Sequence, residues 1–538
     1  MDIPSLFMIP SAVSSGKVHS VFPNSTDADF DFNRDSDATR VNSEGLIERV
    51  GYYGSELITN GDFATDSNWT KGAGWTIANG KATVTSSITD SIYQDALTLG
   101  KTFKVTFQIT NITSGSLRVG IGINFSDYFT EVGTYTFYGQ PSNDTLLRIN
   151  PSSGTNASID NVSVKEITGD RARLNYEIEG GLVNTKPSLL LEPQSTNLLT
   201  YSEDFSDSSW TSQAVGSTVT SNSIVSPDGT LNADTIQGNG SSTFVHIRKN
   251  INLTTASHTF SIFAKKGTNN FLAVQAQYYS GATNTAVIFD LNNRIVTSGS
   301  GNIEDYGNEW LKCSYTVVIS SDVTGRFLIG LAYNGTTIEF PSTLTANGKN
   351  IYIYGAQLEQ LSYSTSYIPT NGSVQSRANE TCNGAGTSSI LPSEEGILYC
   401  EIAALADDST NRLFSLSDGT SQNRIFLGFN AVSNQIRYRV QVANVYQADH
   451  SVSVSDITLF NKIAVKYKAN DFALWINGIK VDTDTSGTTF SAGTLSELNF
   501  DSATGGSPIY SKIRDIRVYN TKEMTDSEVD ILLTKITS

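Results

Sequence analysis

The feature that most constrains the fold of this chain is the alternation of apolar and polar residues in many short segments. It is clear in "KTFKVTFQIT" (101–110), "NFLAVQAQYY" (270–279) and "NQIRYRVQV" (434–442). A period of two places successive side chains on opposite faces of a strand, and turn residues recur every 8–12 positions between such segments. The pattern predicts an all-β chain of tandem antiparallel β-sandwiches with very little helix.

Length and charge narrow the function classes. At 538 residues the chain is too long for one core, so we expect three or four domains. The net charge of −17 argues against nucleic acid and acidic membranes as partners, because both attract basic surfaces. The first residues lack the basic and apolar blocks of a secretory signal, and no long apolar run predicts a membrane span. Three cysteines cannot form a disulfide framework, which fits folding in a reducing cytosol.

One signature occurs twice, as "NGDFATDSNWT" at 60–70 and "SEDFSDSSWT" at 202–211. Each copy is followed by alternating segments and closes on a similar strand, at 157–167 and at 349–361. Two sandwiches of one type explain this duplication. Repeated position favours core packing over ligand contact for the tryptophans of these phrases, which are Trp69 and Trp210, and for Trp310 in the later "WLKCS" phrase.

The first copy resembles jelly-roll carbohydrate-binding modules, which often begin with Asn-Gly-(Asp/Gly)-Phe and end with Ile-Asp-(Asn/Asp)-Val. The matching residues are 60–63 and 159–162. Such modules often hold a structural calcium, and the resemblance implies Glu56, Asp62 and Asp160 as its oxygen ligands. The second copy lacks the last-strand Asp, so we expect no calcium there.

The third section has different signals. Asn477-Gly478 predicts a tight hairpin turn, and Thr525 with Glu528 has the spacing of a capping box at the start of a short helix. The ending "IRVYNTKEMTDSEVDILLTK" resembles the end of concanavalin A-like or laminin G-like lectin sandwiches.

Two phrases before the second sandwich, and one at its end, resemble parts of a family of bacteriophage structural proteins. They are "DFDFNRDSDATRVNSEGLIERV" (29–50), "ARLNYEIEGGLVNTKPSLLLEPQSTNLLTYSEDF" (172–205) and "IYIYGAQLEQLSYSTSYIPT" (351–370). The predicted division is 1–54 as an N-terminal virion-attachment frame, 55–168 as an inserted carbohydrate-binding-like jelly roll, 169–195 as the continuation of the frame, 196–378 as a second such jelly roll, and 385–538 as a lectin-like domain with a short C-terminal helix.

No motif predicts catalysis. The four histidines are scattered without metal-ligand spacing, and nucleophile-elbow, zinc-protease and phosphate-loop motifs are missing. Glycoside hydrolysis needs two carboxyl groups, and the nearest candidates are Glu304, Asp305 and Glu309, which precede a strand of the phage-like frame.

Sugar binding has better candidates on the polar faces of predicted strands, where amides, arginines and aromatic rings meet hydroxyl groups and ring faces. The competing interpretation is a solvated outer sheet. Trp475, beside the hairpin turn, fits either an exposed platform or the core. The candidates are Arg118 and Asn124, with Gly120 and Gly122 leaving room; Gln275, Gln277 and Tyr279; Arg437, Arg439 and Gln441; and Trp475.

These observations predict a non-enzymatic phage virion protein that is assembled in the host cytoplasm and lies on the exterior of the head or tail. It would contact other virion proteins through the frame and bind host-surface or mucus glycans reversibly. The resemblance implies a homo-oligomer, with a trimer favoured. Two alternatives stay open: a purely structural decoration protein and a polysaccharide depolymerase.

Overall fold

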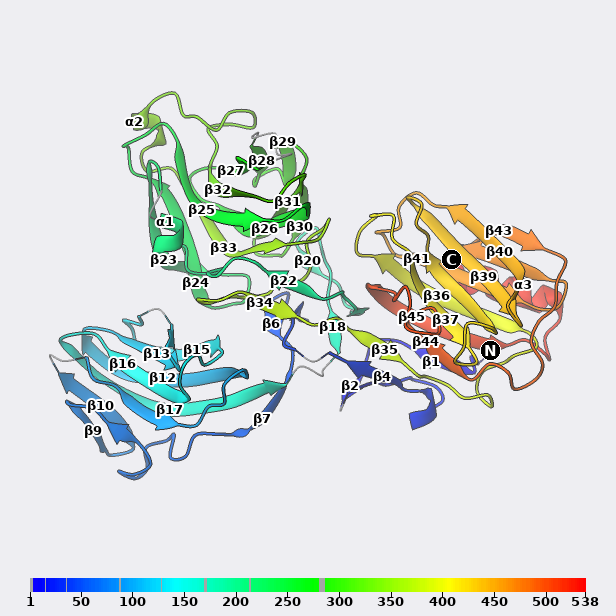
Figure 1. Cartoon of the computed structure of the whole chain (residues 1–538), viewed down its shortest axis with the longest axis horizontal. Helices are drawn as coiled ribbons and strands as arrows, with labels where there is room; N and C mark the ends of the chain where they lie inside the picture. Colours follow the sequence, from blue (N-terminus) through cyan, green and yellow to red (C-terminus); the bar gives the residue numbers. More distant parts are fainter. Residues whose placement is uncertain are drawn as a thin grey trace. The chain divides into compact units, whose positions relative to one another are not determined.

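The computed structural model of the chain describes residues 3–14, 16–34, 36–86, 89–126, 128–168, 172–211, 214–279 and 286–538. Almost all regular structure in these ranges is antiparallel strand (Figure 1), which confirms the predicted class of tandem β-sandwiches. The described helices are η1 (Thr26–Ala28), α1 (Ser208–Thr211), α2 (Thr343–Ala346) and α3 (Asp526–Thr537). None of them has the length and apolar composition needed to cross a bilayer. The chain divides into two compact units, residues 51–169 and residues 1–50 with 170–538.

The unit of residues 51–169 is one sandwich of two antiparallel sheets around its own apolar core. Trp69, Trp75 and Phe107 lie in this core because alternate residues of both sheets point inward. The first sheet has the order β15 (Gly133–Gly139), β12 (Thr102–Ser114), β17 (Thr155–Thr168), β10 (Lys81–Ser86) and β9 (Trp75–Ala78), with β7 (Tyr52–Glu56) also pairing with β17. The second has the order β14 (Asn124–Phe125), β13 (Leu117–Ile121), β16 (Leu146–Pro151), β11 (Ile92–Asp95) and β8 (Thr70–Lys71).

A second sandwich repeats this plan in the larger unit, and the predicted core positions of Trp210 and Trp310 are confirmed. Its six-stranded sheet has the order β23 (Ser217–Val225), β24 (Leu231–Gly238), β33 (Asn350–Glu359), β26 (Ala256–Lys266), β31 (Leu311–Ile319) and β30 (Asn302–Asp305). Its five-stranded sheet has the order β25 (Val245–Leu253), β32 (Val323–Leu331), β27 (Phe271–Gln277), β28 (Val287–Asp290) and β29 (Ile295–Ser298).

The repeated signature makes the same structural contacts in both sandwiches. Trp69 Nε1 donates to Asn60 O at 2.9 Å, and Trp210 Nε1 donates to Tyr201 O at 2.8 Å, nine residues earlier in each case. Each indole also packs on a phenylalanine, with ring centroids 5.2 Å apart for Phe63 and 5.4 Å apart for the second copy. The signature therefore ties the entry segment of each sandwich to its core.

The closing strands share a left-handed residue at an irregularity in their pairing. Asn161 in β17 has φ 53° and Gly355 in β33 has φ 61°. Asn and Gly are the residues that accept this conformation most readily. The amide after each bulge, of Val162 and Ala356, donates at 2.8 Å to the carbonyl of Gly61 and Ser202 respectively. The Asp-Asn and Gly-Ala dipeptides thus serve backbone geometry.

The third sandwich takes strands from both ends of the chain. Its first sheet has the order β18 (Arg173–Asn175), β21 (Ser188–Leu190), β45 (Ser511–Asn520), β36 (Gly396–Ala404), β41 (Asn461–Tyr467), β42 (Phe472–Ile476) and β43 (Ile479–Asp484), and β1 (Leu6–Met8) also pairs with β45. Its second sheet has the order β40 (Val445–Ser453), β39 (Gln435–Val442), β38 (Arg424–Phe429), β37 (Arg412–Ser417) and β44 (Glu497–Asn499).

Short ladders connect these sandwiches within the larger unit. They are β2 (Val13–Ser14), β3 (Lys17–Val18), β4 (Phe30–Asn33) and β35 (Thr381–Asn383) in one sheet, and the pairs β5 (Thr39–Val41) with β6 (Ile47–Arg49), β19 (Ile178–Glu179) with β20 (Leu182–Val183), and β22 (Ser195–Asn197) with β34 (Gln375–Arg377).

Two local predictions for the third section are confirmed. Asn477 and Gly478 have φ 49° and 83°, which makes the tight turn between β42 and β43. Thr525 and Glu528 exchange the two capping-box hydrogen bonds at the start of α3.

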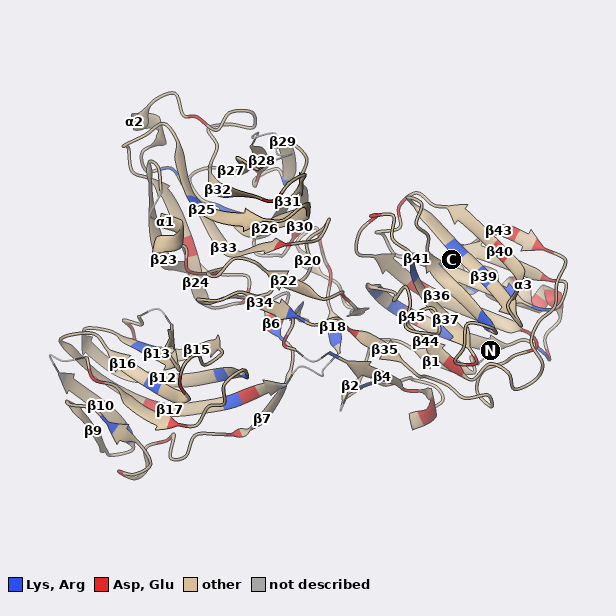
Figure 2. Ribbon diagram, in the orientation of Figure 1, with Lys and Arg blue, Asp and Glu red and all other residues tan. Residues whose placement is uncertain are grey.

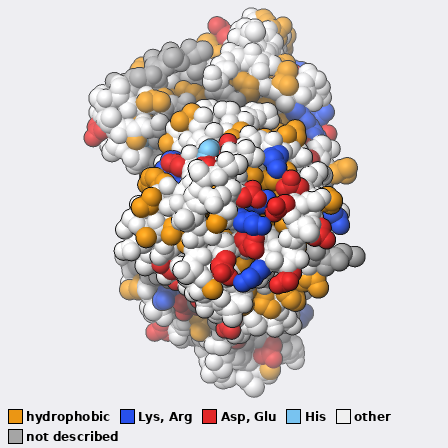
Figure 3. Space-filling model, turned by 90° about the vertical axis from the view of Figure 1, so that its right-hand side faces the viewer, with side chains coloured by type: hydrophobic (Ala, Val, Ile, Leu, Met, Phe, Trp, Pro, Cys, Tyr) orange, Lys and Arg blue, Asp and Glu red, His pale blue; other side chains and the backbone are white. Residues whose placement is uncertain are grey.

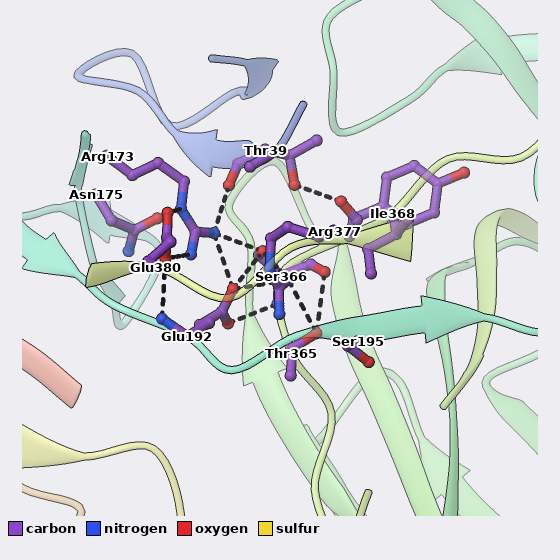
Figure 4. Close-up of polar contacts among 12 residues, drawn as sticks. Thr39, Arg173, Asn175, Glu192, Ser195, Thr365, Ser366, Ile368, Arg377 and Glu380 are labelled. Atoms are coloured by element: carbon purple, nitrogen blue, oxygen red, sulfur yellow. Dashed lines mark hydrogen bonds and ion pairs between the residues drawn. The ribbon is translucent and has the colours of Figure 1, made fainter. Parts of the chain in front are cut away.

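A buried charge cluster joins the frame phrases (Figure 4). It consists of Arg34, Arg173, Glu192, Arg377 and Glu380, whose side chains are at most 4% exposed. Figure 4 labels the last four of these residues. Glu380 accepts from Arg34 Nη1 at 2.7 Å and from Arg173 Nε at 2.9 Å, and Glu192 lies 2.8 Å from Arg173 and 2.9 Å from Arg377. Burial raises the pKa of the Glu380 carboxyl, but Arg173 and Arg34 outweigh burial and keep it below its usual value.

The cluster explains why the frame phrases are spread along the chain. Arg34 comes from the first phrase, Arg173 and Glu192 from the second, and Arg377 and Glu380 from the segment after the second sandwich. Arg34 Nη2 also donates to Val50 O at 2.8 Å, immediately before residues 51–169 begin. The phrases therefore form one polar core of the larger unit.

Candidate functional site

The five-stranded sheet of the second sandwich has a polar outer face. Leu272, Val274 and Ala276 of β27 lie in the core, so the residues between them point outward. Strand register places Gln275 opposite Leu328 and Gln277 opposite Arg326 on β32, while Arg248 of β25 lies opposite Leu328 from the other side. We define the β25–β32–β27 face as His246, Arg248, Gln275, Gln277, Arg326 and the adjoining Tyr278.

A chain of side-chain contacts orders one half of this face. Arg326 Nε donates to Gln277 Oε1 at 2.8 Å, and Gln277 Nε2 donates to Gln275 Oε1 at 2.8 Å. Arg326 Nη2 also donates to the Tyr278 hydroxyl at 3.2 Å, and its guanidinium carbon lies 4.6 Å from the centroid of the Tyr278 ring. The face thus presents the Gln277 amide, a guanidinium and an aromatic ring, and the buried Gln275 amide holds Gln277 in position.

The aromatic residue of this face is Tyr278 and not the predicted Tyr279. Tyr278 has φ 65°, which interrupts the strand alternation, so its ring is 65% exposed while Tyr279 is 3% exposed and packs in the core. The Tyr279 hydroxyl donates to Ile251 O at 3.0 Å, and burial raises its pKa. The prediction that Tyr279 points outward with Gln275 and Gln277 is therefore wrong. A left-handed tyrosine is sparsely populated and costs backbone free energy, so its neighbours must hold it.

The other half of the face has polar groups without partners. Arg248 Nε and His246 Nε2 are withdrawn from solvent with no hydrogen-bond partner among the residues that the structure describes. Burial, Arg248 and Arg326 lower the pKa of His246 to about 4, so its imidazole is neutral at pH 7. Burial and Arg326 also lower the pKa of the Arg248 guanidinium. Figure 2 marks Lys and Arg positions on β25.

Sequence reasoning missed His246, Arg248, Arg326 and Tyr278. The first two alternate with the core residues Val245 and Ile247, so the period-two rule that singled out Gln275 also applied to them. Only the strand pairing reveals that these residues share a face with Gln275.

A hollow on this face is small. It is bordered by His246, Ala273, Gln275, Leu328 and Gly330, and its volume is about 20 Å³. Since one water needs about 10–15 Å³, the hollow admits one or two small groups and not a sugar ring. A sugar would therefore bind across the surface of the sheet and not inside the hollow.

The matching sheet of the first sandwich carries the predicted Arg118 and Asn124, but its glycines leave no open space. A Cβ on Gly120 would lie 2.6 Å from the Phe125 ring, and a Cβ on Gly122 would lie 2.9 Å from Ser142 backbone atoms. The prediction that these glycines make room for a ligand is therefore wrong. The Arg118 guanidinium carbon lies 4.0 Å from the Phe125 ring centroid and 4.9 Å from that of Tyr128.

Two other contacts define this face of the first sandwich. Asn124 Nδ2 donates to Gln140 O, and Arg148 donates two hydrogen bonds to the Asp144 carboxylate, at 2.9 and 2.7 Å. Arg118 Nε and Asn150 Oδ1, on paired residues, have no hydrogen-bond partner among the described residues.

In the third sandwich, the predicted Arg437 and Arg439 share the carboxylate of Asp449, at 2.8 and 2.6 Å. Gln441 accepts from Arg424 Nε at 3.3 Å, and Arg439 lies 3.8 Å from the Tyr446 ring centroid. Figure 3 shows acidic and basic side chains interleaved on the side of this sandwich that is at the right in Figure 1. The basic charge of these arginines is therefore offset locally.

Trp475 offers no platform. It is 2% exposed and packs with Tyr399, Tyr519 and Leu533 under α3. The position beside a hairpin turn was compatible with exposure, but the C-terminal helix covers it.

The predicted calcium ligands have protein partners. Glu56 Oε1 accepts from Val164 N at 2.7 Å and from Ile58 N at 3.1 Å, and Glu56 Oε2 accepts from Ser163 Oγ at 2.6 Å. Asp62 accepts from Ala64 N, and Asp160 accepts from Asn161 N. Within the described part of the chain, no three His, Cys, Asp or Glu side chains are grouped as a metal site. Calcium binding by these three carboxylates stays a prediction.

The carboxylates considered for hydrolysis lie in ion pairs. Glu309 is 3.3 Å from Lys265 and 3.9 Å from Lys266, Glu304 is 3.9 Å from Lys312, and Asp305 pairs with Arg294. Each of the three is therefore matched with a basic side chain.

Comparisons with known proteins give structural similarities only. No protein-family model matches the chain, and no curated protein matches its sequence. Among solved structures, the CBM40 domain of Ruminococcus gnavus IT-sialidase bound to alpha2,3 sialyllactose is 16% identical, with 29% of this chain and 88% of that chain covered and a TM-score of 0.23. A point mutant of NanB sialidase from Streptococcus pneumoniae is 20% identical, with 27% of this chain and 25% of that chain covered and a TM-score of 0.22.

Proposed function

We propose that the chain is a non-enzymatic attachment protein on the exterior of a bacteriophage head or tail, and that it binds host-surface or mucus glycans reversibly. The observation that supports glycan binding best is the β25–β32–β27 face. Gln277 and Arg326 offer hydrogen-bonding groups beside the exposed Tyr278, which is the combination that binds sugar hydroxyls and sugar ring faces.

The virion role rests on the resemblance of the frame phrases to phage structural proteins. On that resemblance the frame contacts other virion proteins and the assembled protein is a homo-oligomer, with a trimer expected. Weak sites gain strength when several are displayed together, because each binding event raises the effective concentration for the next.

The test is a glycan array probed with the full-length chain and two variants. Gln277→Ala removes an amide of the face, and Gln375→Ala removes a half-buried amide of β34 as the matched control. We expect Gln277→Ala to weaken binding about fivefold or more, and Gln375→Ala to bind like the parent chain. The absence of any bound glycan would overturn the binding proposal, and release of reducing ends would identify a depolymerase instead.

Imaging of the intact particle by cryo-EM tests the virion role. We expect the sandwiches to project outward with the β25–β32–β27 face in solvent. Burial of that face against neighbouring subunits would instead identify a decoration protein that stabilises the particle.

A further inference from the structure

The chain is acidic overall, yet the β25–β32–β27 face is basic. The net charge of the chain is −17, whereas this face combines Arg248 and Arg326. Among the residues that the structure describes, neither guanidinium forms an ion pair with a carboxylate. Glu339, which follows Ile338 at the edge of the hollow, accepts from Thr243 Oγ1 at 3.0 Å.

The two arginines are neighbours on the face. Arg248 of β25 lies opposite Leu328 of β32, and Arg326 is two residues from Leu328 on β32. The two arginines are therefore diagonal neighbours across the strand pair. Diagonal positions have Cα atoms about 7–8 Å apart, within the combined reach of two arginine side chains. Burial and the nearby Arg326 lower the pKa of Arg248, and an anion between the two guanidinium groups would offset the repulsion.

On the basis of the proposed glycan binding, we propose that this face selects acidic sugars, with a carboxylate or sulfate group held between Arg248 and Arg326. The planar guanidinium donates two parallel hydrogen bonds to such oxyanions. The sugar ring then lies against Tyr278, whose left-handed backbone is held by the contact of its ring and hydroxyl with Arg326.

The charge of the whole chain limits the size of the ligand. A long polyanion would be repelled by the net negative charge of the chain, whereas a single acidic residue in an otherwise neutral glycan would meet only the local basic face. The hollow beside Gln275 and Gly330 has room for one small substituent of that residue, such as a hydroxyl or methyl group.

The test compares each acidic glycan with its neutral parent. The full-length chain is applied to an array carrying uronate-containing, sialylated and sulfated glycans, each beside the same glycan without the acidic group. The variants are Arg248→Gln and Arg326→Gln, and the control is Arg294→Gln on the same sandwich, where the arginine already pairs with Asp305. Thermal melting of each variant checks that it is folded.

We expect at least a tenfold preference for acidic over neutral glycans. Arg248→Gln and Arg326→Gln should lose that preference, and Arg294→Gln should keep it. The carboxylate and sulfate arms distinguish the two oxyanions. Equal binding of acidic and neutral glycans would overturn this inference and leave the proposed function standing, whereas binding to no glycan would overturn both. An acidic preference that survives both variants would place the anion site elsewhere on the chain and also overturn the inference.

Discussion

The two jelly rolls have the same kind of five-stranded sheet but differ in how the arginines on it are partnered. In residues 51–169, Arg148 is neutralised by Asp144 and Arg118 is covered by aromatic rings. In the second sandwich, Arg248 and Arg326 lie on the equivalent outer face without a carboxylate among the described residues. The covering groups come from short segments beside the central strands. The strands therefore build the platform, and its flanking segments decide whether it is open and charged.

The largest predicted difference between the two units concerns the buried charge cluster. Glu380→Gln leaves Arg34 and Arg173 buried with too little negative charge, so the free energy of unfolding of the larger unit should fall by about 3–5 kcal/mol. Differential scanning calorimetry should show this loss in one transition and an unchanged transition for residues 51–169. Glu309→Gln is the control, because that carboxylate is exposed, and its effect should stay below about 1 kcal/mol. A loss spread over both transitions would contradict the separation of the two units.

A smaller difference is a pH dependence confined to the second sandwich. Burial and Asp228 raise the pKa of Glu203 to about 7, and its carboxylate accepts from Tyr367 at 2.9 Å and Tyr354 at 3.1 Å. The folded state holds this proton more tightly than the unfolded chain does, so stability should fall as pH rises from about 5 to about 7 and then level off.

Glu203→Gln keeps the accepting oxygen and removes the titration. It should therefore stabilise the larger unit by about 1–3 kcal/mol at pH 8 relative to pH 5, measured by urea unfolding at both pH values. Asp62→Asn, in the same signature of the first sandwich, is the control for removing a carboxylate and should leave the slope of the larger unit unchanged. The same slope in parent and Glu203→Gln chains would rule Glu203 out as its source.

The shared tryptophan signature should respond equally in both sandwiches. Trp69→Phe and Trp210→Phe each remove an indole hydrogen bond to a carbonyl nine residues earlier and leave a small void. We expect a loss of about 1–2 kcal/mol in the unit that holds the changed residue. Chemical denaturation measures both losses, and a strongly unequal pair would show that the repeat does not do the same job twice.

The smallest predicted effect comes from making the outer face of the first sandwich more like the β25–β32–β27 face of the second. Asp144→Asn frees Arg148 of its carboxylate partner, and because the pair is partly exposed its loss should cost less than about 1 kcal/mol. The first sandwich should then gain a weak preference for acidic glycans on the array, of a few fold. Asp66→Asn, which frees Lys71 in the same sandwich, controls for the change in charge. An equal gain in both variants would assign the effect to net charge.

Much of the fold could be predicted because it depends on local rules. Alternation identified the sandwiches, the Asn477-Gly478 turn needs left-handed residues, and the capping box of Thr525 and Glu528 is set by their spacing. The face of Gln275 and Gln277 also followed from alternation. It failed one residue later, because the left-handed backbone of Tyr278 turns Tyr279 inward and no sequence rule assigns that conformation to tyrosine.

The remaining errors involve side-chain packing that the alternation pattern does not report. The chain ending in α3 covers Trp475, and the Phe125 ring fills the space over Gly120. The charge of the β25–β32–β27 face depends on which carboxylates come near Arg248 and Arg326, and strand pairing decides this. For the candidate residues of the first and third sandwiches, sugar binding stays a prediction.

The buried charge cluster also bears on how such a chain can change during evolution. All five of its charged residues lie outside residues 51–169 and outside the paired sheets of the second sandwich. Recombination that exchanges a whole sandwich therefore leaves the cluster intact, and the new sandwich is attached to a frame that is already folded around it. On the proposed glycan binding, a lineage would change its sugar specificity in one genetic step, without mutations in the residues that connect the domains.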